Sequence, residues 1–206
     1  MDINTILDYF ETVDPILAHA GHEVITKLAP SVKQSSKNYL SDLCESIVSQ
    51  QLSVKAASTI WARTHGTVGN WNDPHLIVSV LSEDLRACGL SGQKISYVKN
   101  IADAVLNQRL HLTKFDEMTD QETINELVQI KGIGQWTAEM FLIFSLGRED
   151  VFSSGDLGLR NGIKKLYDLE LVTPHAAHEL SLKWAPYRSY ASIILWKTLD
   201  NEPITV

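Results

Sequence analysis

Two short stretches contain residues whose types and spacing could do chemistry: Gly132 and Gly134, and Asp156 directly after Gly155. A turn made by glycine lets another molecule approach the backbone closely. The helix predicted to begin near Gln135 has unpaired amides in its first turn, at the positive end of the helix dipole. Such a turn suits an anion such as a phosphodiester, although ordinary turns between helices use glycine too.

Asp156 allows two interpretations. It opens a predicted helix, as a capping acid does, and it is also a carboxylate that could assist a reaction. The helix from Gln135 to Ser145 leads about 16 Å away from the glycine turn. Residues 146–155 can span roughly 30 Å when extended. The spacing thus allows Asp156 to lie at the mouth of a cleft beside the turn.

The elements that must position these residues are all predicted to be helices. Apolar residues recur at helical spacing, and no run shows sustained alternation, so the predicted fold class is all-α. Helix starts are predicted from capping residues: Asp14-Pro15, Ser53, Asp73-Pro74, Thr119 with Glu122, and Thr173-Pro174. We expect the helix that starts at Ser53 to end at Gly66, and the apolar run 140–144 to be buried on most sides.

Composition and charge describe an ordinary globular chain of 206 residues with a net charge of −7. No apolar run approaches the length of about 20 residues that spans a membrane. The acidic, amphipathic first residues resemble no signal or transit peptide. Cys44 and Cys88 are the only cysteines, which indicates reduced core thiols and excludes an iron–sulfur cluster with four cysteine ligands.

The negative charge argues against a nucleic-acid partner, because phosphate binding depends on Lys and Arg. The distribution weakens this objection. Acidic residues gather in the first 15 residues and in 116–126, whereas eight basic residues follow from Lys131 onward. A basic face on an acidic body remains compatible with DNA binding.

Four stretches together resemble a known family. The hairpin LVQIKGIGQWTAE (127–139) resembles the helix-hairpin-helix of the DNA glycosylase superfamily, and SSGDLGLR (153–160) resembles the segment with its catalytic aspartate. Residues 49–57 and 184–190 narrow the resemblance to the DNA-3-methyladenine glycosylase II group. The resemblance implies that Asp156 is catalytic and that the hairpin occupies about 121–145.

The resemblance also implies a domain organisation. It covers nearly the whole chain, 1–206, as one domain with two helical subdomains and a cleft for DNA and the flipped base between them. One subdomain is expected from about 1–36 plus 147–206, and the other from about 37–146. The β-domain that precedes this core in some relatives has no counterpart, so we expect the minimal helical core.

Further site residues follow from the resemblance. The base pocket is expected to contain Trp136, Met140, Trp184 and Tyr187, although core packing is the alternative for each aromatic residue. Contacts with DNA are expected from Gln51, Leu52, Ser53, Lys131, Gly132, Gly134, Gln135 and Arg160. Leu52 is the candidate wedge between base steps, whereas Gln51, Leu52 or Ser53 could fill the gap left by the flipped base.

The family implies few cofactors. The backbone carbonyls of Val128, Ile130 and Ile133 match positions that hold a monovalent cation, Na⁺ or K⁺, and carbonyl oxygens suit such a hard ion. No other cofactor is required by the resemblance.

The function implied is a monofunctional glycosylase of base excision repair that removes alkylated purines from double-stranded DNA. Superfamily members that also cut the strand have a nucleophilic lysine where this chain has Trp136, so no lyase activity is expected. The alternatives are a glycosylase for another damaged base, a lesion-binding protein without activity, and a helical interaction protein. We expect a monomer without membrane contact, in the bacterial cytoplasm at the nucleoid or in a eukaryotic nucleus.

Overall fold

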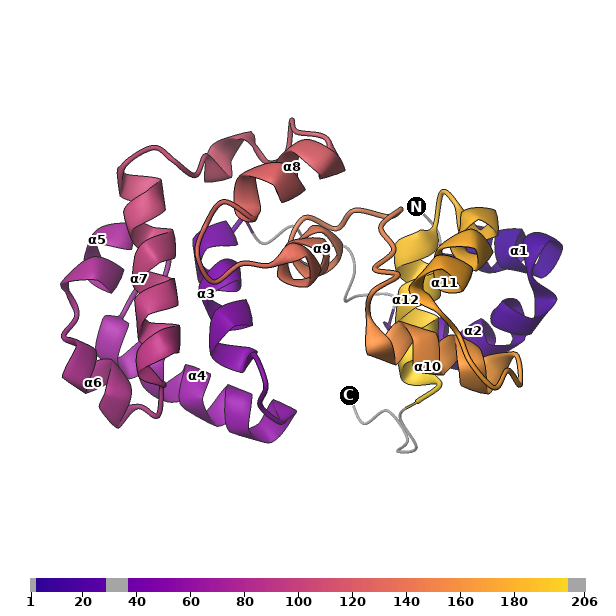
Figure 1. Ribbon diagram of the computed structural model, residues 1–206, viewed down its shortest axis with the longest axis horizontal. Coiled ribbons are helices and arrows are strands. Elements are labelled where there is room, and N and C mark those ends of the chain that lie inside the picture. The colour runs from indigo at the N-terminus through magenta and orange to yellow at the C-terminus, as the bar shows by residue number, and fades with distance from the viewer. Residues whose placement is uncertain (1–2, 29–36, 200–206) are drawn as a thin grey trace. The chain divides into compact units, whose positions relative to one another are not determined.

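A computed structural model of the chain describes residues 3–28 and 37–199 (Figure 1). Within these ranges every regular element is helical, which confirms the all-α prediction. The helices are α1 (Ile3–Val13), α2 (Pro15–Leu28), α3 (Tyr39–Ser49), α4 (Val54–Val68), α5 (Pro74–Ser79), α6 (Ser82–Ala87), α7 (Gly92–Leu106), η1 (Leu112–Lys114), α8 (Asp120–Leu127), α9 (Gln135–Phe144), α10 (Leu157–Leu166), α11 (Pro174–Ser181), η2 (Leu182–Trp184) and α12 (Arg188–Lys197).

The helices form two compact units, each described by itself. Unit 1 contains Met1–Gln34 and Leu142–Val206, and unit 2 contains Ser35–Phe141. The resemblance implies boundaries near 37 and 146. The observed units divide before Ser35 and after Phe141, and the second division falls inside α9. The predicted cleft between the subdomains stays a prediction.

Unit 2 is built around α7, which packs against α3 and α5 (Figure 1). The apolar stripe of α7 is buried as its periodicity predicts, with Ile95, Val98 and Ile101 in the core. A second part of the core is aromatic, since the ring of Phe115 packs against those of Tyr39 and Phe141. This core fixes the ends of α3 and α8, from which the loops of interest emerge.

Unit 1 has its own core, in which α12 packs against α2 and α10, and α1 packs against α2 (Figure 1). The side chains of Ile6, Phe10, Ile163 and Ile194 are fully buried there. Asp14 caps α2 by accepting the Leu17 amide at 3.2 Å, as Asp14-Pro15 predicts. This core holds the first turn of α10 against α12.

One local prediction needs correction, and another holds with one exception. The helix from Ser53 does not end at Gly66 but continues to Val68, and the residue after it, Gly69, has the positive φ of 81°. The apolar run 140–144 of α9 is buried on most sides, as predicted, since Phe141, Leu142 and Ile143 are buried. Phe144 is the exception and is 53% exposed. The Phe144 ring stacks on that of Trp196, which covers one face of the otherwise exposed side chain.

The two cysteines lie in the core, as predicted. Cys44 and Cys88 are buried free thiols, and burial raises the pKa of the Cys44 thiol, so that it stays protonated. No helix in the described ranges is long and apolar enough to cross a membrane.

Candidate nucleic-acid interface and catalytic carboxylate

The helix-hairpin-helix consists of α8, a seven-residue turn (128–134) and α9. The predicted capping box of α8 is present, since Thr119 and Glu122 exchange hydrogen bonds. Inside the turn the Ile130 amide donates to the Leu127 carbonyl, and the Ile133 amide donates to the Ile130 carbonyl, both at 3.0 Å. The turn is therefore an ordered structure held by its own backbone.

The two glycines of this turn differ in what they allow. Gly132 has a φ of 113°, and a Cβ there would lie 2.5 Å from Cγ of Tyr97. Both the backbone conformation and the close approach of α7 therefore require glycine. Gly134 has neither feature, and a Cβ there would meet no atom within 4 Å. Gly132 is thus needed for folding, whereas Gly134 leaves open space beside the first amides of α9.

The outer side of the turn is accessible. Lys131, Gly134 and Gln135 are exposed, and the side chain of Trp136 is 48% exposed. Exposed amides at a helix start, beside a lysine, suit a phosphate. The structure thus brings together the hairpin residues expected to contact DNA, while the contact itself stays a prediction.

The loop from Gln50 to Ser53 lies beside the hairpin. The Gln50 Nε2 atom is 3.5 Å from the Gly132 carbonyl and 3.4 Å from the Thr137 hydroxyl. These long contacts bring the loop with the wedge candidate and the hairpin turn to one region of unit 2.

Within this loop, the three predicted residues have different surroundings. Gln51 and Leu52 are exposed, and Gln51 has the uncommon φ of 57°. Ser53 caps α4, as predicted, by accepting the Ala56 amide at 3.3 Å. Its hydroxyl is thus engaged in its own helix, which favours Gln51 or Leu52 over Ser53 for filling a gap in DNA.

Lys94 supports the loop and was not predicted from the sequence. Its ammonium group, reaching from α7, donates to the carbonyls of Val48 and Gln50, both at 2.7 Å. These carbonyls belong to the end of α3, where helical partners are lacking. Burial lowers the pKa of the Lys94 ammonium group.

Asp156 is the N-cap of α10 in unit 1. Its Oδ1 accepts the Leu159 amide at 2.7 Å and the indole N–H of Trp196 at 3.0 Å. The residue is only 9% exposed, yet its neighbours Gly155 and Leu157 are exposed. The capping interpretation is therefore correct. The catalytic role stays a prediction for a buried carboxylate whose neighbours in the chain are exposed.

The four residues expected in the base pocket are divided between the units. Trp136 and Met140 lie on α9 in unit 2, exposed and half-buried respectively. Trp184 and Tyr187 lie in the core of unit 1. The structure does not show them as one pocket.

Trp184 has surroundings that favour core packing, the alternative already open for it. Its side chain is 0% exposed, its indole N–H donates to Asp14 at 2.8 Å, and its ring packs against Phe152. A fully enclosed ring has no face to offer a base. Tyr187 is also buried, with its ring edge-on to Tyr9 at 5.3 Å.

Several basic side chains are engaged within unit 1. Arg160 donates to the Val172 carbonyl at a long 3.5 Å, and its buried Nε has no hydrogen-bond partner in the described ranges. Arg188 forms a two-bond ion pair with Asp150 at 2.7 and 2.9 Å. The guanidinium groups of Arg160 and Arg188 thus support loops of unit 1, and DNA contact by Arg160 stays a prediction.

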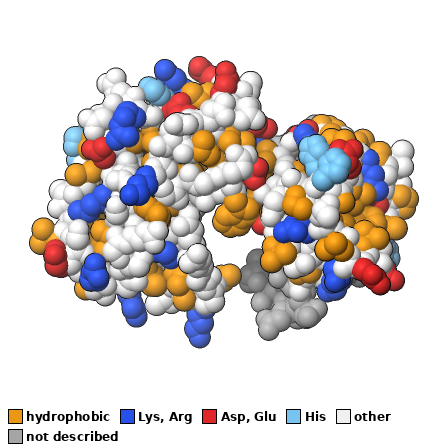
Figure 2. Space-filling model, viewed as in Figure 1, with side chains coloured by type: hydrophobic (Ala, Val, Ile, Leu, Met, Phe, Trp, Pro, Cys, Tyr) orange, Lys and Arg blue, Asp and Glu red, His pale blue; other side chains and the backbone are white. Residues whose placement is uncertain are grey.

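Positive charge is spread out on the visible face. Figure 2 shows the Lys and Arg side chains there scattered among uncharged ones and not gathered in one patch. The basic face that the sequence leaves open is therefore not visible from this side.

The carbonyls expected to hold a cation lie in the hairpin turn. Ile130 already accepts the Ile133 amide through its carbonyl, and a carbonyl oxygen has a second lone pair for an ion. The cation at this turn stays a prediction. Residues 3–28 and 37–199 contain no group of three or more His, Cys, Asp or Glu placed to hold a metal.

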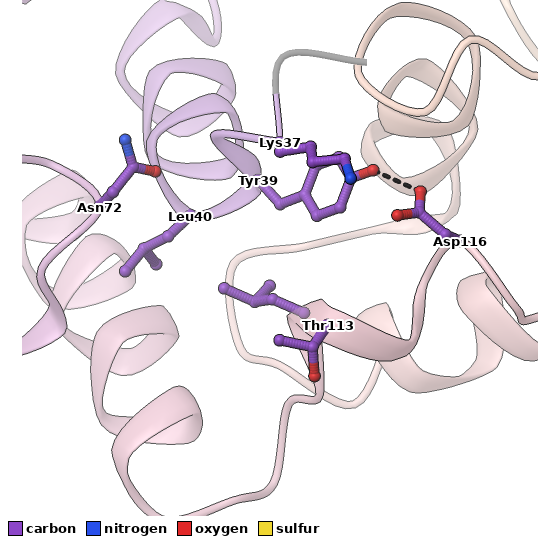
Figure 3. A pocket seen from close by; sticks show the side chains of 7 residues that line it. Lys37, Tyr39, Leu40, Asn72, Thr113 and Asp116 are labelled. Carbon is purple, nitrogen blue, oxygen red and sulfur yellow. Dashed lines mark hydrogen bonds between the residues drawn. The ribbon is translucent and has the colours of Figure 1, made fainter.

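A cavity of about 350 Å³ lies elsewhere in unit 2 (Figure 3). The Tyr39 hydroxyl donates to Asp116 across it at 2.6 Å, and Lys37, Asn72 and Thr113 also line it. None of the residues predicted to bind DNA or the base lines this cavity.

Comparison with known proteins identifies the class. Residues 44–186 match the family described as the HhH-GPD superfamily of base excision DNA repair proteins, and the chain belongs to this superfamily. The matched segment includes both the hairpin and Asp156, which confirms the resemblance seen in the sequence.

Particular relatives are named for 3-methyladenine. DNA-3-methyladenine glycosylase 1 of Schizosaccharomyces pombe is 37% identical over 85% of this chain and 79% of its own length. The crystal structure of a Bacillus halodurans DNA-3-methyladenine glycosidase is similar with a TM-score of 0.71 and 41% identity, over 79% of this chain and 76% of that one. The structure of the S. pombe 3-methyladenine DNA glycosylase in complex with abasic DNA is similar with a TM-score of 0.71 and 39% identity, over 78% of this chain and 80% of that one.

Proposed function

We propose that this protein is a monofunctional DNA glycosylase of base excision repair that removes alkylated purines and leaves an abasic site. The single observation that supports this most is Asp156, a buried carboxylate held in place by two hydrogen bonds within the segment that matches the superfamily. The names of the relatives support 3-methyladenine-type bases as the substrate class. Double-stranded DNA is the proposed partner.

The chemistry requires one well-placed carboxylate. Breaking the N-glycosidic bond leaves positive charge on the sugar, which the Asp156 carboxylate would stabilise electrostatically. It would also orient the attacking water and accept its proton as the new bond to the sugar forms. An N-alkylated purine is already cationic, so it takes the electrons of the broken bond and leaves neutral. A second acid, which most other glycosidases use, is not needed.

Absence of strand cleavage is part of the proposal. Trp136 occupies the position at which lyase members of the superfamily have their lysine nucleophile. An indole cannot form the Schiff base with the sugar that strand cleavage by this route requires. The expected product is therefore an intact strand with an abasic site.

Base release from methylated duplex DNA tests the proposal. We expect the wild type to release 3-methyladenine or 7-methylguanine, and Asp156→Asn to release it at least about 100-fold more slowly. The control is Asp168→Asn, another carboxylate of unit 1, whose φ of 52° asparagine tolerates. Strand breaks that appear without alkali would contradict the monofunctional proposal.

The same assay separates the alternatives. Release of oxidised or deaminated bases in place of methylpurines would indicate a glycosylase for another lesion. Tight binding to an abasic duplex without any release would indicate a lesion-binding protein. A protein with neither property would show that the hairpin has only a structural role.

A further inference from the structure

Trp196 makes a tertiary contact with Asp156 that an ordinary helix cap does not have. The Leu159 amide comes from the same helix, three residues after Asp156, as in any N-cap. The indole N–H of Trp196 comes from α12, 40 residues later, and donates to the same Oδ1 at 3.0 Å. An indole N–H can only donate, so Oδ1 must present its lone pairs to both groups.

The packing at Gly158 shows how tightly this contact is built. A Cβ at Gly158 would lie 3.0 Å from Asp156 Oδ1, 3.0 Å from Trp196 Cδ1 and 3.2 Å from its Nε1. Such distances are too short for an ordinary Cβ contact, so a side chain there would push the indole and the carboxylate apart. The absence of a side chain at Gly158 therefore lets the indole edge reach the carboxylate.

The indole is also held from a third direction. The ring of Phe144, at the end of α9, stacks on that of Trp196 with centroids 5.8 Å apart and an angle of 29° between the planes. The residues of this arrangement all belong to unit 1: Phe144, Asp156, Gly158 and Trp196. Phe144 is exposed and Trp196 is partly exposed, so this arrangement reaches the protein surface beside the buried Asp156.

We propose that Trp196 is a positioning residue, whose indole N–H fixes the orientation of the Asp156 carboxylate for attack on the damaged nucleotide. The terminal torsion of an aspartate is soft, and two fixed donors to one oxygen restrict it. The placement of a reacting group within about 1 Å can change a rate by about 100-fold. This inference rests on the proposed function, because orientation matters only if Asp156 acts on the substrate.

Trp196→Phe tests the inference, since it removes the donor and keeps an aromatic ring against Phe144. We expect the single-turnover rate of methylpurine release to fall about 10- to 100-fold, while the affinity for an abasic duplex stays unchanged. The control is Trp61→Phe, at a half-buried tryptophan of unit 2, which should release bases at the wild-type rate. Wild-type release by folded Trp196→Phe would overturn the inference.

A spectroscopic measurement decides the matter even if Trp196→Phe does not fold. The chain has five tryptophans, so five indole N–H resonances are expected in ¹⁵N-labelled protein. The assigned Trp196 resonance should move in Asp156→Asn, and an unmoved resonance would overturn the inference. Wild-type release by Asp156→Asn would instead contradict the proposed function, so the two failures remain distinguishable.

Discussion

Asp14 and Asp156 are two carboxylates of unit 1 with the same local arrangement. Each caps a helix by accepting the amide three residues later, from Leu17 or Leu159. Each also accepts an indole N–H from a distant tryptophan, at 2.8 Å for Asp14 and 3.0 Å for Asp156. Local geometry alone therefore does not distinguish a structural carboxylate from a candidate catalytic one.

Their surroundings do differ. Asp14 is 3% exposed and also binds the Lys183 ammonium group at 2.8 Å and the Tyr167 hydroxyl, so that both of its oxygens are engaged and one faces a cation. Asp156 is 9% exposed, and its chain neighbours Gly155 and Leu157 are exposed. Asp14 is thus enclosed and paired with a cation, whereas Asp156 is buried next to an exposed stretch of chain.

The strongest test of this contrast is to make the same substitution at both positions. We expect Asp14→Asn to lower the free energy of unfolding by about 2–4 kcal/mol, because it removes a buried charge from a paired cation. Asp156→Asn should lower it by less than about 1 kcal/mol, because asparagine caps helices well. The rate of base release should instead fall more for Asp156→Asn than for Asp14→Asn. Denaturant unfolding provides the stabilities, and equal losses at both positions would remove the distinction.

The pH dependence sharpens the same prediction. Burial raises the pKa of Asp14, but hydrogen bonds from Lys183, Tyr167, Trp184 and the Leu17 amide outweigh it and lower the pKa overall. Because the pKa of Asp14 is lower in the folded state, its ionised carboxylate stabilises the protein above the pKa of the unfolded state, about 3.9. This stabilisation is lost as the pH falls further. The stability difference between wild type and Asp14→Asn should thus be constant from about pH 5 to 7 and shrink below about pH 4.

A similar contrast, with the next largest effect, separates the two hairpin glycines. We expect Gly132→Ala to lower the free energy of unfolding by about 2–4 kcal/mol, because of the positive φ and the contact with Tyr97. Gly134→Ala should leave stability nearly unchanged and weaken binding to abasic DNA, since its Cβ would occupy open space beside the first amides of α9. Unfolding and binding measured on both variants check this, and unchanged DNA binding by Gly134→Ala would mean that DNA does not approach there.

Capping contacts could be predicted from the sequence because their partners lie within four residues. The box of Thr119 and Glu122, and the caps at Asp14, Ser53 and Asp156, are all of this kind. The hairpin and Asp156 were found through a resemblance of short motifs.

Contacts between distant residues could not be predicted in this way. The pairing of Trp196 with Asp156, of Trp184 with Asp14 and of Lys94 with the end of α3 depends on how helices pack. The difference between Gly132 and Gly134 has the same origin, because only the position of Tyr97 reveals it. Residues that touch a substrate leave a local pattern, whereas residues that position them do so through the tertiary fold.

Lys94 and Lys99 provide the last and most closely matched comparison. Both lie on α7, and each ammonium group donates to two carbonyls at the end of a helix: Val48 and Gln50 for Lys94, and Val78 and Val80 for Lys99. Only Lys94 supports the loop with the wedge candidate Leu52. The two lysines are therefore equivalent in the fold and different in position relative to the proposed DNA contact.

Replacing each lysine by methionine tests whether support of the loop matters for DNA. We expect each variant to lose about 1 kcal/mol of stability, because two charged hydrogen bonds are lost at a partly exposed site. Only Lys94→Met should bind an abasic duplex more weakly, by roughly 3- to 10-fold, since the loop must be ordered again on binding. Fluorescence anisotropy at fixed salt provides the dissociation constants. Equal weakening by both variants would indicate a general effect of stability, whereas weakening by Lys94→Met alone would place the loop at the DNA.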